Sequence, residues 1–135
     1  MNKKYAIPYI QNYLSFLFLD EELERKIDTV YLFGSGRRKE LEKGSDIDIF
    51  LDCKEEQEKN IIQRANAAYR RFCESKDYEK WKLLKFIYPI SIQAGNLEKW
   101  ELKASIANEG IILFSKKAKK MEERERKLLL SLQLP

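Results

Sequence analysis

The sequence has no histidine among its 135 residues. Imidazole is the side chain that most often serves as a general base near neutral pH, and it is also a common zinc ligand. Its absence excludes Ser-His-Asp triads and most zinc hydrolase sites. A general base in this chain must therefore be a carboxylate, a lysine, a tyrosine or water.

Cysteine and long apolar runs are scarce as well. The two cysteines, Cys53 and Cys73, show neither the spacing of a metal site nor a disulfide framework. They indicate reduced thiols in a cytoplasmic protein. Because no long uninterrupted apolar run is present, we expect no transmembrane helix and no membrane partner.

The composition that remains is that of a single charged globular domain. Hydrophobic residues make up 44% of the chain and charged residues 36%. There are 26 basic and 22 acidic residues, which gives a net charge of +4. This small positive excess suits ligands that carry phosphate without requiring nucleic acid, so nucleic acid is the less favoured partner.

Hydrophobic periodicity predicts helices and strands in alternation. Helices are expected over residues 7–26, 37–43, 55–76 and 96–108. Strands are expected over residues 29–33, 47–51, 86–93 and 111–114. This order predicts an α/β domain of the α+β type over residues 1–115, followed by a charged helical tail over residues 116–135.

One motif carries recognisable chemistry. Gly34-Ser35 follows a predicted strand, ten residues intervene, and Asp46-Ile47-Asp48 begins the next strand. Residues i and i+2 of a strand point to the same face, so the two aspartates project together while Ile47 points into the core. Paired carboxylates repel each other unless a cation lies between them, and hard oxygen ligands suit Mg²⁺.

The residues between the two halves of the motif favour a phosphate ligand. Gly34 allows the backbone to approach a ligand closely, and Ser35 offers a hydroxyl and an amide donor. Arg37, Arg38 and Lys43 follow on the same loop, where their charges suit a triphosphate. The expected ligand is therefore a nucleoside triphosphate bound together with a divalent metal.

Tyr31-Leu32-Phe33-Gly34-Ser35 and Ser45-Asp46-Ile47-Asp48-Ile49 resemble the minimal nucleotidyltransferase family of the polymerase-β-like superfamily. The resemblance implies a mixed sheet of four to five strands flanked by helices. It also implies transfer of a nucleoside monophosphate, with ATP as the expected donor of AMP, to a hydroxyl acceptor. Asp46 and Asp48 would be the catalytic ligands of two Mg²⁺ ions, while Gly34, Ser35 and the neighbouring Ser45 would bind the nucleotide.

The sequence departs from that family in two places. Members often carry Arg-x-Arg-Gly after Gly-Ser, whereas here only Arg38 falls in register. Active members also use a third carboxylate on a later strand, and the corresponding position is expected to be Ser91. Losing one metal ligand can slow phosphoryl transfer by orders of magnitude without abolishing nucleotide binding.

Three functions therefore stay open at this point. The first is an Mg²⁺-dependent nucleotidyltransferase. The second is a regulatory module that binds nucleotide and metal without turnover, as the missing carboxylate suggests. The third is a nucleic-acid accessory protein, which rests on the sequence pI of about 9.0 and the basic tail.

The tail adds a question about partners. It ends in a leucine-rich run over residues 128–134, which either packs on its own domain or forms a docking helix for a partner or a second copy. Minimal nucleotidyltransferases often pair with helical partner proteins, frequently RNase toxins of the HEPN type. The resemblance thus implies a toxin-antitoxin partner as one alternative to a homodimer.

Overall fold

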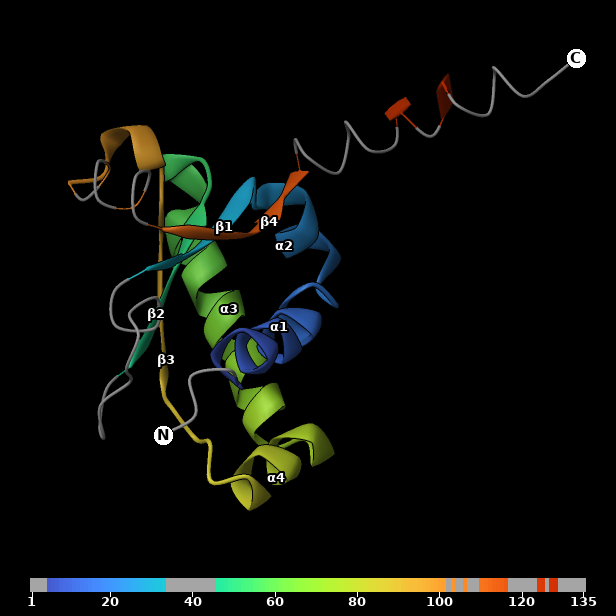
Figure 1. Ribbon diagram of the computed structural model, residues 1–135. Helices are drawn as coiled ribbons and strands as arrows, with labels where there is room; N and C mark the ends of the chain where they lie inside the picture. Colours follow the sequence, from blue (N-terminus) through green and yellow to red (C-terminus); the bar gives the residue numbers. More distant parts are fainter. Residues whose placement is uncertain are drawn as a thin grey trace, which may run out of the picture.

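The computed structural model contains a four-stranded mixed sheet in the order β3-β2-β1-β4 (Figure 1). β1 pairs antiparallel with both β2 and β4, whereas β2 and β3 run parallel. The strands are β1 (Thr29–Phe33), β2 (Ile47–Asp52), β3 (Ile90–Gly95) and β4 (Ile111–Ser115). The predicted α+β class with a mixed sheet is therefore confirmed.

The structure describes most but not all of the chain. The described residues are 5–33, 46–101, 103, 106, 110–116, 124, 125, 127 and 128. The short helix predicted over 37–43 lies outside them, and so does most of the predicted tail. Of the helices in the described ranges, none is long and apolar enough to cross a membrane.

Helices α1 and α3 lie across one face of the sheet (Figure 1). The helices are α1 (Ala6–Leu17), α2 (Glu21–Lys26), α3 (Glu58–Cys73) and α4 (Lys76–Leu83), with 3₁₀ turns η3 (Glu55–Gln57) and η4 (Leu97–Lys99). Alternate strand residues such as Val30, Ile47 and Ile49 are fully buried beneath α1 and α3. This layer contains the main hydrophobic core.

An aromatic cluster joins α1 to α3 inside that core. The rings of Tyr9 and Phe72 lie 5.5 Å apart, edge to face. The hydroxyl of Tyr9 donates to the carbonyl of Tyr88 at 2.8 Å, and that of Tyr13 donates to the carbonyl of Ala65 at 2.9 Å. Because both phenols are hydrogen-bonded, they can be fully buried without the cost of an unpaired polar group.

The opposite face of the sheet carries a smaller apolar cluster. Phe50 and Ile106 are fully buried there, with Tyr31, Phe33 and Trp100 packed around them. The ring of Phe50 lies 5.2 Å from that of Trp100.

The helix predicted over residues 7–26 is two helices. α1 ends at Leu17, and α2 begins only after Asp20. The Asp20 carboxylate accepts a hydrogen bond from the Glu22 amide at 3.0 Å while its own backbone is extended. This N-cap competes with helix continuation, so the prediction of one helix was wrong.

The helix predicted over residues 55–76 is also divided. Residues 55–57 form the turn η3, and α3 ends at Cys73. Ser75 then caps the unpredicted helix α4 by accepting a hydrogen bond from the Tyr78 amide at 3.2 Å. Competing local capping again decided the boundary.

The strand predicted over residues 86–93 begins later and runs further. β3 starts at Ile90, because Pro89 has no amide hydrogen to give to a strand pair. The carbonyl of Pro89 still accepts a hydrogen bond from the Ile47 amide at 2.8 Å. The helix predicted over 96–108 begins as expected at Asn96, which caps η4, but the backbone becomes extended at Trp100. Much of the remainder lies outside the described residues.

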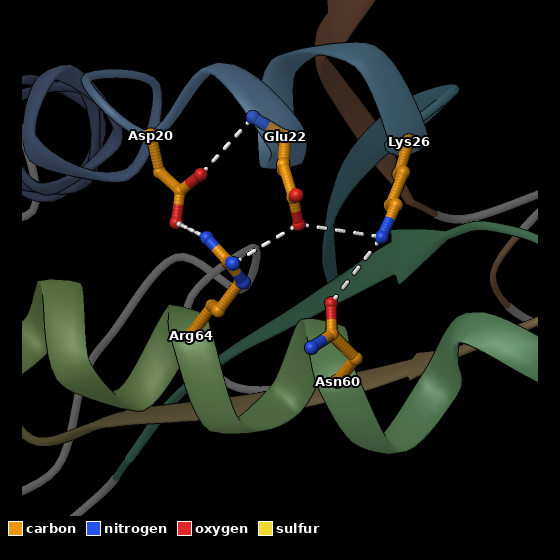
Figure 2. A network of polar contacts seen from close by, with 5 residues as sticks. All are labelled: Asp20, Glu22, Lys26, Asn60 and Arg64. Atoms are coloured by element: carbon orange, nitrogen blue, oxygen red, sulfur yellow. Dashed lines mark hydrogen bonds and ion pairs between the residues drawn. The ribbon is translucent and has the colours of Figure 1, made fainter.

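A polar network attaches α2 to α3 (Figure 2). Arg64 of α3 forms ion pairs with Asp20 at 2.7 Å and with Glu22 at 3.0 Å. Lys26 lies within 3.4 Å of Glu22 and contacts Asn60 at 3.5 Å. Burial opposes ionisation of Asp20, but its bonds to Arg64 and to the Glu22 amide outweigh burial and hold the pKa of this carboxyl below its ordinary value.

Replacing Arg64 by alanine should lower the urea midpoint at pH 7, and the loss should shrink at pH 3. A carboxyl with a lowered folded-state pKa stabilises the fold above its ordinary pKa of about 3.9, and that contribution disappears as the pH falls through the lowered value. Urea denaturation of both proteins at the two pH values measures this. Arg70→Ala, an exposed change on the same helix, is the control; equal losses for both variants would contradict the assignment.

Candidate functional site

The two aspartates of the motif lie at the start of β2. Asp46 is exposed and directly precedes the strand, and Asp48 is its second residue and half-buried. Ile47 and Ile49 are fully buried on the helix-covered side. By strand alternation Asp48 therefore faces the outer side of the sheet, opposite the main core.

The electrostatics of this pair favour a bound cation. Burial raises the pKa of the Asp48 carboxyl, and the nearby negative charge of Asp46 raises it further. Both effects disfavour the ionised form of Asp48 in the metal-free protein. A divalent cation between the carboxylates would reverse the second effect, because it replaces repulsion by attraction. The donor set therefore fits a hard metal ion.

The neighbouring strands bring specific residues to Asp48. In the antiparallel pair with β1, Asp48 lies opposite Phe33, the residue before Gly34. β1 therefore ends at Phe33, directly beside Asp48. Five predicted nucleotide-binding residues themselves lie outside the described residues: Gly34, Ser35, Arg37, Arg38 and Ser45.

On its other side, Asp48 lies opposite Ser91 in the parallel pair with β3. The residue on the adjacent strand opposite Asp48 is thus a serine. Within the described ranges, no group of three or more His, Cys, Asp or Glu residues is arranged to hold a metal. Any further ligands at this point must come from phosphate, water or residues beyond those described.

Other carboxylates of the described structure are used elsewhere. Asp52 lies at the far end of β2 and accepts a hydrogen bond from the Leu97 amide at 3.0 Å. Asp77 accepts one from Asn12 at 3.0 Å, which joins α4 to α1. Glu79 pairs with Lys82 at 3.1 Å on the surface of α4. None of the three lies next to Asp48.

Sequence reasoning missed a cavity farther along the same strands. It has a volume of about 560 Å³ and includes Gln93 of β3 and Trp100 among its lining residues. The lining residues come from two segments, 55–58 and 93–101, that are distant from each other in sequence, and no local pattern signals that these segments meet.

Comparison with known proteins agrees with the geometry. A family model described as "Polymerase beta, Nucleotidyltransferase" matches residues 18–119. The matched segment contains all four strands together with Asp46 and Asp48. No curated protein matches the chain.

Asp48→Asn should raise the thermal midpoint of the metal-free protein at pH 7. An acid whose folded-state pKa is raised contributes stability below its ordinary pKa and loses it as the pH rises through the raised value, so at pH 7 the ionised Asp48 is a cost. The gain should shrink near pH 3, where the carboxyl is protonated in both states. Circular dichroism melts in EDTA measure it, with exposed Glu56→Gln as the control. A lower midpoint at pH 7 would contradict this electrostatic account.

Proposed function

The chain belongs to the polymerase beta nucleotidyltransferase family, and on that basis we propose that it transfers AMP from ATP to a hydroxyl acceptor in the presence of Mg²⁺. The observation that carries the proposal is the Asp46–Asp48 pair on the outer side of β2, inside the matched segment. The raised pKa of Asp48 supports the proposal. Its ionised carboxylate is unfavourable in the protein alone, and a bound cation would stabilise that negative charge.

In the proposed reaction, one part of the motif binds the metal and the other part binds the phosphates. Asp46 and Asp48 would hold Mg²⁺, and the cation would supply positive charge to neutralise the phosphates. Gly34 and Ser35 would bind the terminal phosphates, and Arg37 and Arg38 would balance their charge. The acceptor oxygen bonds to the α-phosphorus, the bond from that phosphorus to the bridging oxygen breaks, and pyrophosphate leaves.

Among the described residues, no third carboxylate lies at the level of Asp48 to receive the acceptor proton. Ser91 occupies the neighbouring position, and its hydroxyl is not a base at neutral pH. The proton would therefore pass to water, which makes the expected transfer slow. This observation also favours a second candidate function, a regulatory module that binds nucleotide and metal without turnover.

The minimal nucleotidyltransferase subfamily and its partners are part of the same proposal. The resemblance of residues 31–35 and 45–49 to that subfamily supports it. A helical HEPN-type protein would then be the partner, and its hydroxyl side chains would be candidate acceptors. A homodimer is the alternative partner arrangement.

Calorimetric titration of each nucleoside triphosphate, with and without Mg²⁺, tests the proposal first. We expect Mg²⁺-dependent binding in wild type and a loss of affinity of roughly tenfold or more when Asp46 and Asp48 are both changed to Asn, since the neutral amides cannot hold the cation. Asp77→Asn, a change on α4, is the matched control and should bind like wild type. Equal affinity in all three proteins would contradict the site assignment.

Ser91→Asp should raise the rate of pyrophosphate release from ATP by roughly tenfold or more, because it restores a carboxylate next to Asp48. Ser91→Asn has nearly the same size but no charge, and it should leave the rate near that of wild type. A coupled pyrophosphate assay on all three proteins measures the effect. If the aspartate and asparagine variants behave alike while both remain folded, Ser91 does not mark the missing ligand.

A further inference from the structure

A concave site separate from the aspartate pair lies at the β3 edge of the sheet. Its cavity of about 560 Å³ falls within the size range of small-molecule sites. Gln93 contributes to it from β3, Glu58 from the first turn of α3, and Trp100 and Glu101 from the segment after η4. None of these residues has a role in the proposed transfer.

A glycine lies against two of the residues that line this cavity. A Cβ atom added at Gly95 would lie 3.1 Å from Cε3 of Trp100 and 3.7 Å from a carboxylate oxygen of Glu58. The indole and the carboxylate therefore converge over the bare backbone of Gly95. The indole is held in place by Phe50, whose ring lies 5.2 Å away. The wall is thus a fixed aromatic surface beside a negative charge.

The charges lining the cavity are mostly negative. Its acidic residues are Glu55, Glu58 and Glu101, and its single basic residue is Lys99. Lys99 forms an ion pair with Glu55 at 2.9 Å. Neither Glu58 nor Glu101 forms an ion pair with any other described residue. Two carboxylates therefore give this site an excess of negative charge.

Gln93 adds an unused acceptor. Its side-chain oxygen is buried and, within the described structure, has no hydrogen-bond partner. A buried polar atom without a partner costs free energy. Gln93 lines the same cavity as the carboxylates, so this polar side chain lies beside the negative charge.

We propose that this cavity binds a small organic ammonium ion. An ammonium group supplies positive charge and several donors at once, and the face of an indole attracts it further. A metal ion fits less well, because the described residues contain no cluster of three or more acidic ligands arranged around one point. An anion is excluded by the negative lining.

The proposal is independent of nucleotide transfer, so its test uses protein without nucleotide or metal. The probe is 1,5-diaminopentane, and 1,5-pentanediol is its uncharged counterpart of the same length. The readout is the ¹⁵N–¹H indole resonance of each of the two tryptophans. Trp81 is an internal control, since its indole donates to Asn12 at 2.9 Å, away from the cavity.

We expect the diamine to shift the Trp100 resonance saturably, and we expect the diol to leave it unchanged. Changing Glu58 and Glu101 together to Gln should lower the affinity for the diamine at least tenfold. The Glu79→Gln variant, changed on α4, should bind the diamine with the affinity of wild type. The glutamines keep the size of the side chains, and an unchanged Trp81 resonance reports that the double variant is folded. An absent shift, an equal response to the diol, or unchanged affinity in the double variant would each overturn the proposal. Nucleotide titration of the same samples reports separately on the transferase assignment.

Discussion

The alternation of side chains along β2 is the constraint on which both the core and the site depend. Ile47, Ile49 and Leu51 are fully buried on the helix side, while Asp48 and Phe50 face outward. β2 has a hydrogen-bonded neighbour on each edge, so a shift of one residue would place a carboxylate in the core and expose isoleucines. The same pleat that stabilises the core therefore also orients the acidic residue of the candidate site.

The two faces of the sheet are stabilised by different groups of residues. α1 and α3 cover one face, and the buried Phe72 packs between them. On the outer face, the described residues form the small cluster around Phe50. Asp48 is half-buried on this side, and the cavity that includes Gln93 lies at the β3 edge of the sheet.

Two aspartates show how location decides the role of one residue type. Asp20 caps a helix and pairs with Arg64, so its pKa is lowered and its charge stabilises the fold. Asp48 is half-buried next to Asp46, so its pKa is raised and its charge is a cost. The Asp48 arrangement lowers the stability of the fold, which is common at sites that bind a cation or a substrate.

Local pattern was sufficient to predict the strands over 29–33 and 47–51 and the outward orientation of Asp48, because strand periodicity and turn residues act over a few positions. It was insufficient at residues 18–20, where a capping side chain competes with the helix. It also could not reveal the cavity, whose walls come from residues 55–58 and 93–101. The parallel β2–β3 register decides which residues of these separate segments meet. That register depends on contacts between residues far apart in sequence, so it is set only when the tertiary structure forms.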